Sequence, residues 1–375
     1  MGFLIPKTLN RKAKVTQTTS KFVLPANSEM VQGISGQSNG SGEGINSQAL
    51  STEIDSTTFA KIWRDNNVAF ANLNIDASNN YYNNIGKHGL ELAMAERYEA
   101  LNLQSLNIVK YGVGGTEIVE HLKGGVVWQN YRNNFTVKAI NQLLASGKRV
   151  FFQEIFILGE GNSEFQYLVD DAGNEVDRLI ALHRAIFGAN VPITFVEIYQ
   201  RNPRTAQYNA MLNQKASTDP YLTVIPNTGL TTNDGLHYDY ASLKIIEQRY
   251  WDKNIQPIEI TAPLAISSDL VAPATMILNS VTQVGNTLTV VANLNGGDAI
   301  TSNSNLWFKL YSGFPVYYRS GTDTNDANVS ISGSIVTLIN IPVVYRYLYD
   351  FSIVAVDEQG NYSNKSNVIT KTLTF

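Results

Sequence analysis

Short apolar runs alternate with amphipathic segments along the first two thirds of the chain. In the stretches between these runs, apolar residues recur at helical spacing over 88–102, 138–147, 176–188 and 241–251. The runs themselves have the continuous apolar character of strands that are covered on both faces, and they lie at 30–35, 106–111, 149–158, 193–198 and 222–225. This alternation of strand and helix predicts a mostly parallel sheet with helices on both faces.

The pattern changes near residues 252–263, where the chain becomes rich in Pro and Ala. Helical periodicity then stops, and strand-like runs separated by Gly, Asn and Asp turns continue to the end, which predicts a β-sandwich. The first residues are polar and lack periodicity. We therefore expect an extended N-terminal arm over 1–28, an α/β domain over 29–255, a linker over 256–268 and an all-β domain over 269–375.

Composition narrows the classes of function. The net charge is −4, and charged residues make up only 16% of the chain, so no attraction to nucleic acid is indicated. No apolar run is long enough to insert into a membrane. Cysteine is absent, which excludes disulfides and thiol chemistry. No motif for a metal or another cofactor is present, so none is expected.

The start of the chain carries no recognisable secretory signal, because its apolar patch is too short. The chain begins with Met-Gly, as N-myristoylation signals do, but Pro6 occupies the position where such a signal has Ser or Thr. We therefore do not predict myristoylation.

Four polar, glycine-containing turns follow predicted strands, at 36–39, 112–116, 159–163 and 232–237. If the sheet is parallel, all four meet at the edge where its strands end, which is where ligands bind in open α/β sheets. Each turn alone also fits an ordinary loop. Their convergence favours a functional site.

One of these turns holds a serine and another holds a histidine with a nearby carboxylate. Ser38 is a weak nucleophile without a base, and His237 with Asp234 three residues earlier supplies a base and its orienting group. The glycine turns direct backbone N–H groups at an oxyanion, and Asn162 adds a side-chain donor. Read alone, Asp234 and His237 also fit a polar turn before the next helix. His88, His121 and His183 fall in or beside predicted helices, which favours structural, capping or surface roles for them.

The order of these motifs resembles SGNH-type hydrolases, most closely the sialate O-acetylesterase and acetylxylan esterase branch. The resemblance covers about residues 29–250, and it rests on Gly36-Gln37-Ser38-Asn39, His88-Gly-Leu-Glu-Leu, Gly114-Gly115-Thr116, Gly159-Glu160 and Asp234-Gly-Leu-His237. It implies a flavodoxin-like three-layer α/β/α sandwich with a parallel sheet and hydrolysis of sugar acetyl esters through an acyl-serine. By matching position, the resemblance makes Ser38 the nucleophile, His237 the base and Asp234 its orienting residue.

The resemblance also implies that the backbone N–H groups of Ser38 and Gly114 form part of the oxyanion hole. We add the neighbouring Gly115 to this set. We assign Gln37, Asn39 and Glu160 to substrate binding.

Two positions depart from the family pattern. Leu158 stands where the family commonly has Gln before Gly-Glu, and a leucine donates no hydrogen bond, which puts the level of activity in doubt. Gly40 stands where Met often follows, and this difference is expected to alter packing only. The C-terminal stretch 349–363 resembles a strand and turn of a fibronectin type III or related immunoglobulin-like domain.

The first functional hypothesis is therefore a serine esterase that removes O-acetyl groups from carbohydrate, with an acetylated glycan as its substrate. The alternative is a structural or adhesive phage virion protein, of the tail or fibre, on an SGNH scaffold with weak or no activity. The two hypotheses are compatible, because a virion protein can itself be a glycan deacetylase. A secreted bacterial esterase is a third possibility. An extracellular or virion-associated location is expected, with surface or virion assembly partners and a homo-oligomer, which the arm and tail would suit.

Overall fold

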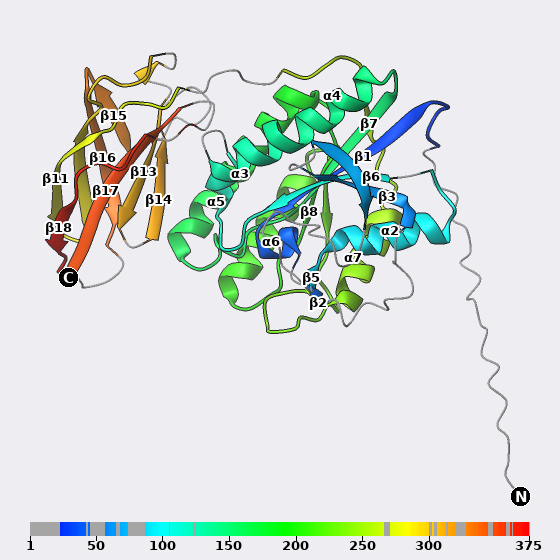
Figure 1. Cartoon of the computed structure of the whole chain (residues 1–375). Coiled ribbons are helices and arrows are strands. Elements are labelled where there is room, and N and C mark those ends of the chain that lie inside the picture. The colour runs from blue at the N-terminus through cyan, green and yellow to red at the C-terminus, as the bar shows by residue number, and fades with distance from the viewer. Residues whose placement is uncertain are drawn as a thin grey trace, which may run out of the picture.

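Figure 1 shows the chain as a computed structural model. The structure describes residues 23–42, 44–45, 57–64, 68–73, 87–104, 106–122, 125–265, 271–299, 302–303, 306–312, 314–319, 328–343, 348–357, 361 and 363–374. Most of the predicted N-terminal arm and part of the predicted linker lie outside these residues.

The central sheet is mostly parallel, as the strand pattern predicts. Its order is β4-β3-β6-β1-β7-β8-β9, and every neighbouring pair from β3 to β9 is parallel. All five predicted strands are present, within a residue or two of the expected bounds at most ends. The bounds are β1 Ser28–Gly36, β3 Thr57–Arg64, β4 Ala69–Leu73, β6 Leu106–Gly112, β7 Arg149–Ile157, β8 Ile193–Val196 and β9 Leu222–Ile225.

Three strands of this sheet were not predicted. The hairpin β3–β4 forms one edge, where half-buried Lys61 and Arg64 break the continuous apolar pattern of the inner strands. Strand β10 (Ile258–Ile260) pairs antiparallel with β7, although it falls inside the expected linker. A two-residue ladder joins β2 (Gly44–Ile45) to β5 (Lys87–His88) beside the sheet.

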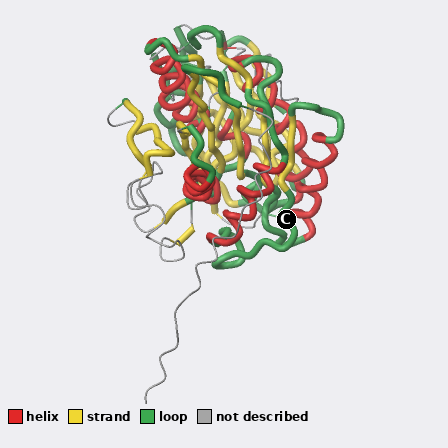
Figure 2. The backbone as a smooth tube through the Cα atoms, turned by 90° about the vertical axis from the view of Figure 1, so that its right-hand side faces the viewer, coloured by secondary structure: helices red, strands yellow, loops and turns green. Residues whose placement is uncertain are grey.

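Helices cover both faces of the sheet, and Figure 2 shows the strands lying between them. Alternate residues of β1 enter two different apolar cores. Val31 packs in a cluster with residues of α3 (Val126–Trp128), α4 (Lys138–Ala145) and α5 (Gln166–Phe187). Met30 and Ile34 pack in a second cluster with α2 (Leu90–Ala100) and α7 (Tyr240–Asp252). The result is a three-layer α/β/α arrangement.

Some helical segments were longer than predicted or were missed. Helix α5 begins ten residues before the predicted start, because its first turns are polar and carry no clear apolar stripe. Helix α6 (Pro203–Ala216) has few apolar residues, and the Asn202 side chain caps it by accepting a bond from the Thr205 backbone. Residues Gln129–Val137 form a π-helical stretch that leads into α4.

The C-terminal part of the chain forms two four-stranded antiparallel sheets, as the strand-like runs predict. One has the order β11-β12-β16-β15 and the other β14-β13-β17-β18. Inward-facing residues such as Phe308, Leu310 and Val290 form one apolar core. The bounds are β11 Ile277–Val284, β12 Thr287–Asn293, β13 Trp307–Ser312, β14 Phe314–Arg319, β15 Val329–Ser332, β16 Ile335–Pro342, β17 Leu348–Val356 and β18 Ile369–Thr372.

Candidate active site

The candidate nucleophile sits where the first strand of the sheet ends. Gly36 is the last residue of β1 and lies in register with Gly112 of β6 and Ile157 of β7. A Cβ at Gly36 would lie 1.9 Å from the Ile157 carbonyl oxygen, and its φ is 146°, so only glycine fits this position. The chain then turns sharply, and Ser38 opens the short helix α1 (Ser38–Ser41).

Ser38, His237 and Asp234 form one chain of hydrogen bonds. His237 Nε2 lies 2.9 Å from Ser38 Oγ, and His237 Nδ1 lies 2.6 Å from Asp234 Oδ2. The second carboxylate oxygen of Asp234 accepts from the backbone N–H groups of Leu236 and His237 at 3.0 and 2.8 Å. The structure therefore brings together the three residues to which the sequence assigns catalytic roles, although Ser38 and His237 are 199 residues apart.

The Asp234 carboxylate is strongly held in its charged form. Burial by itself would raise its pKa, but the hydrogen bonds from the His237 backbone and ring and from the Leu236 backbone outweigh that effect. The pKa of Asp234 is about 2. Its side chain is 52% exposed, so this carboxylate meets water, unlike the buried acid of many catalytic triads.

Asn39 links three parts of the site. Its Nδ2 donates to Glu160 Oε1 at 2.7 Å and to the Leu236 carbonyl oxygen at 3.1 Å. Its Oδ1 accepts from the Tyr238 backbone N–H at 2.9 Å. One buried carboxamide thus fixes the loop of Asp234 and His237 relative to the residue that follows Ser38.

Gln37 and Glu160 are buried in the same way. Gln37 Oε1 accepts from the backbone N–H groups of Gly159 and Gly161 at 3.0 and 3.2 Å. Burial raises the pKa of Glu160, and the bond from Asn39 opposes that rise. These side chains and Asn39 are each less than 5% exposed and bind to protein groups. Their contacts position the loops around Ser38.

The second glycine turn lies directly beside Ser38. A Cβ on Gly114 would lie 3.6 Å from the Ser38 Cβ, and Gly115 has a φ of 74°. Thr116 Oγ1 donates to the Val113 carbonyl at 2.7 Å and lies 3.2 Å from His121 Nε2. Burial lowers the pKa of His121 to about 3, so its ring is neutral in the folded protein.

Backbone donors of this region are available to a ligand. Among the described residues, the N–H groups of Ser38, Gly114 and Gly115 have no hydrogen-bond acceptor. All three belong to the pair of turns that meet at the nucleophile. They are therefore suited to bind a negatively charged oxygen.

Asn162 and Leu158 lie inside the protein. Asn162 Oδ1 accepts from the Ile118 backbone at 2.8 Å, and its Nδ2 donates to Glu175 at 2.9 Å. Leu158 is fully buried in the apolar cluster beneath α5. The Asn162 side chain thus ties the third glycine turn to the second.

The other histidines are all buried. His183 Nδ1 lies 2.5 Å from Glu154 in the core, and His121 belongs to the 3₁₀ helix Ile118–His121. His88 packs edge-on against Tyr240. Its neighbour Lys110 forms an ion pair of 2.7 Å with Glu91, in which neither side chain is exposed. The sequence analysis missed this pair and the Thr116–His121 contact, and neither has a spacing that marks it.

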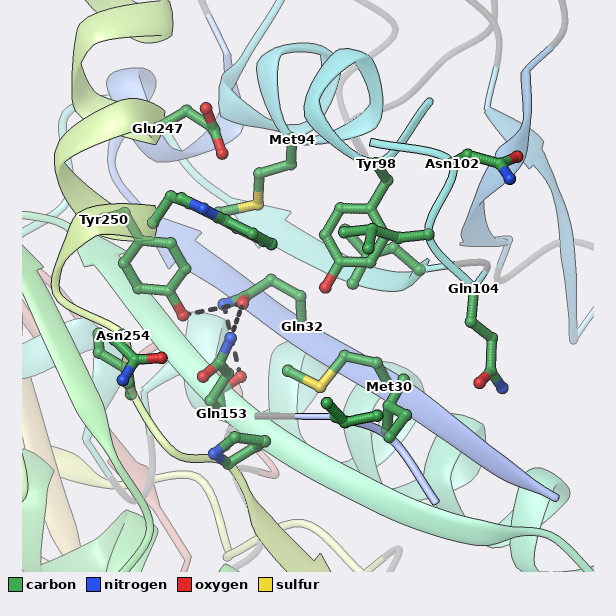
Figure 3. Close-up of a pocket in the computed structure, with 17 residues that line it drawn as sticks. Met30, Gln32, Met94, Tyr98, Asn102, Gln104, Gln153, Glu247, Tyr250 and Asn254 are labelled. Atoms are coloured by element: carbon green, nitrogen blue, oxygen red, sulfur yellow. Dashed lines mark hydrogen bonds between the residues drawn. The ribbon is translucent and has the colours of Figure 1, made fainter. Parts of the chain in front are cut away.

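A cavity of about 470 Å³ lies away from Ser38, between α2, α7 and the start of the sheet strands. Figure 3 shows Tyr98, Met94, Met30 and Tyr250 around it. At its floor Gln32 Nε2 donates to the Gly33 carbonyl, so Gln32 Oε1 accepts from Tyr250 and Gln153. The amide oxygen of Gln153 is buried and has no hydrogen-bond partner among the described residues.

A serine, a histidine and a carboxylate joined in this order, beside free backbone N–H groups, have the arrangement that serine hydrolases use. The model of the carbohydrate esterase, sialic acid-specific acetylesterase family matches residues 31–256. The chain belongs to this family of carbohydrate acetylesterases.

Several solved structures are similar to this chain to different degrees. A protein from Arabidopsis thaliana is 16% identical with a TM-score of 0.51, over 60% of this chain and 98% of its own. A carbohydrate acetylesterase from Xanthomonas citri is 12% identical with a TM-score of 0.42, over 92% and 81%. NanS is 12% identical with a TM-score of 0.48, over 62% and 98%. A search of curated proteins finds no match.

No described helix is both long and apolar enough to cross a membrane.

Proposed function

We propose that this protein is a serine esterase that removes O-acetyl groups from carbohydrate through an acetyl-serine intermediate. The hydrogen-bonded chain Ser38–His237–Asp234 carries the proposal. The family membership of residues 31–256 supports an acetylated sugar as the substrate. No metal or cofactor takes part in the steps below.

In the first half of the reaction, Ser38 Oγ attacks the acetyl carbonyl carbon while His237 Nε2 takes the serine proton. The oxyanion binds the backbone N–H groups of Ser38, Gly114 and Gly115, and we leave buried Asn162 out of this oxyanion hole. The ester C–O bond then breaks, and His237 gives its proton to the departing sugar oxygen. Acetyl-Ser38 and a free sugar hydroxyl remain.

In the second half, His237 takes a proton from a water molecule that attacks the acetyl carbon. The bond to Ser38 Oγ breaks, His237 returns the proton to Ser38, and acetate leaves. Asp234 stays ionised throughout and stabilises the imidazolium that forms twice in each cycle.

The test is acetate release from p-nitrophenyl acetate, O-acetylated sialic acid and acetylated xylan. Ser38→Ala should lower kcat by about 10³-fold or more. Ser35→Ala is the matched control, because this buried serine lies three residues before Ser38, near the end of β1, and its hydroxyl has no partner among the described residues. Wild-type rates no higher than those of Ser38→Ala on all three substrates would contradict the proposal.

The remaining expectations are separate proposals. The division into an α/β domain over 29–255 and a fibronectin type III-like domain over 269–375 rests on the strand pattern and the resemblance. A virion-borne setting rests on the low charge, the polar composition and the expected N-terminal arm and C-terminal domain, and a homo-oligomer rests on that arm and domain. Detection of the chain in purified phage particles tests the first of these two, and light scattering of the purified protein tests the second.

A further inference from the structure

One face of β13 and β17 is buried against the α/β part of the chain. Along β13, Phe308 and Leu310 point into the core of the C-terminal sheets. The alternate residue Trp307 belongs to the same apolar cluster as Ile118 and Leu122 of the α/β part, and it is 2% exposed. Strand β13 is therefore covered on both faces. In a domain joined to the α/β part only by a flexible linker, one of these faces would be exposed to water.

The paired strand β17 repeats this arrangement. Val356 lies opposite Trp307 and Val354 lies opposite Lys309, and both valines belong to the α/β cluster. The chain that leads into the C-terminal sheets is also fixed, because Leu264 exchanges two hydrogen bonds of 2.8 Å with the side chain of Asn141 on α4. The two parts are held together by packing and by hydrogen bonds.

The polar centre of this contact is Lys309. Its Nζ lies 3.6 Å from Glu120 Oε1, and the two side chains are only 10% and 13% exposed. Glu120 belongs to the 3₁₀ helix that follows the glycine turn 114–116. Burial lowers the pKa of Lys309, and the carboxylates of Glu120 and Glu117 oppose that shift.

A short series of contacts joins Lys309 to the glycine turn beside Ser38. The second oxygen of Glu120 accepts from the Glu117 backbone N–H at 3.2 Å. Glu117 directly follows Thr116, whose hydroxyl bonds to both ends of this segment, at Val113 and His121. The position of Gly114 relative to Ser38 thus depends on a segment that a distant strand holds.

We infer that Lys309 is a positioning residue for the glycine turn 114–116, so that the C-terminal sheets help to build the oxyanion hole. This inference rests on the proposed function, because the turn matters most when an oxyanion forms. Lys309 touches no substrate. It acts through Glu120 and Glu117.

The test compares Lys309→Met, Lys309→Arg and the control Lys371→Met in the full chain. Lys371 lies on β18 of the same sheet and donates to the Val281 carbonyl, away from the glycine turn. With p-nitrophenyl acetate, Lys309→Met should lower kcat about tenfold and change KM less than about twofold, since a displaced donor acts mainly on the transition state. Lys309→Arg should restore most of kcat, and Lys371→Met should match wild type.

Hydrogen exchange provides a readout that needs no activity. In Lys309→Met, the hydrogen-bonded amides of Glu117, Ile118 and Glu120 should exchange at least about tenfold faster than in wild type, with amides of β7 unchanged. If the single variant does not fold, Lys309→Met combined with Glu120→Gln removes both charges and tests the same contact.

Wild-type kcat together with unchanged exchange in a folded variant would overturn the inference. If the wild type is inactive but Lys309→Met still speeds up exchange in this segment, the proposed function is overturned and the positioning role stays supported.

Discussion

At the scale of single residues, the site depends on side chains that orient other side chains. Asp234 contacts the ring and the backbone N–H of His237 and also accepts from the backbone N–H of Leu236. Asn39 binds the same loop through the Tyr238 backbone N–H. These bonds settle which nitrogen of His237 faces Ser38. The reactive geometry therefore exists before any substrate binds.

Asp234→Asn tests the role of this carboxylate. An amide still orients the ring but no longer stabilises an imidazolium, so kcat should fall by about 10²-fold or more. Water around the exposed Asp234 reduces the loss relative to a fully buried acid. Because the pKa of Asp234 is about 2, protonation of this group should not limit activity anywhere above about pH 4.

Asp239→Asn is the control for that measurement. Asp239 caps α7 through the Ser242 backbone N–H and lies outside the hydrogen-bonded chain. Its loss should lower stability by about 1 kcal/mol or less and leave kcat near wild type. Equal losses of kcat in both variants would show that Asp234 acts only through folding.

The meeting of the residues to which we assign the chemistry was easier to predict than the roles of the side chains around them. Ser38, His237 and Asp234 follow from residue type and from convergence at one sheet edge. Gln37, Asn39 and Glu160 lie on the same loops, and the sequence does not show whether such side chains point at a ligand or into the protein. Their burial comes from contacts more than 120 residues away in the chain, such as Gln37 with Gly159.

At the scale of elements, helices α2 and α7 pack around a carboxyl group, that of Glu247, whose charged form is disfavoured by burial. Glu247 of α7 accepts from Arg97 of α2 at 2.9 Å. Burial raises the pKa of Glu247 to about 7, and the Arg97 contact only partly opposes this. Between pH 4.5 and 7 the folded state therefore binds more protons at this position than the unfolded state does.

Glu247→Gln should change the pH dependence of stability. In wild type, this group lowers the free energy of unfolding as the pH rises from about 4.5 to 7, by up to about 3 kcal/mol. The variant should lose that slope, which denaturant unfolding at pH 5, 6, 7 and 8 would measure. Glu99→Gln, on the exposed end of α2, should follow wild type. A steeper slope in Glu247→Gln would mean that the ion pair outweighs burial.

Prediction of elements succeeded where the apolar pattern was continuous and failed at edges. Strands β1, β6 and β7 are covered on both faces, so most of their residues are apolar, and buried polar residues such as Gln32, Lys110 and Glu154 interrupt the runs without hiding them. The β3–β4 hairpin and β10 are stabilised by pairing with strands that are distant in sequence. Their own residues carry too little pattern to mark them.

At the scale of the whole molecule, the C-terminal sheets and the α/β part share a buried surface. The sequence predicts an all-β unit behind a linker, but it does not show that one face of β13 and β17 would be covered. In the sequence, Trp307 and Lys309 alternate with Phe308 and Leu310, and a face that carries a lysine looks like one that is exposed to water. Only the folded chain shows that they meet Glu120 and the apolar cluster around it.

Trp307→Ala should weaken the coupling between the two parts. Removal of this buried ring should cost about 3–5 kcal/mol of contact between them. Calorimetry should then show one unfolding transition in wild type and two in the variant. Trp251→Ala, on the surface of α7, should lower the transition temperature without splitting it. Two separate transitions in wild type would contradict a shared core.

The central claim is that Ser38 is an activated nucleophile. A fluorophosphonate reacts with such a serine and forms a stable phosphonyl ester as fluoride leaves, and peptide mass spectrometry locates the adduct. We predict one adduct per chain, on the peptide that contains Ser38, present in Ser35→Ala, absent in Ser38→Ala and formed far more slowly in His237→Ala. No adduct in wild type, or one that persists in Ser38→Ala, would contradict the account.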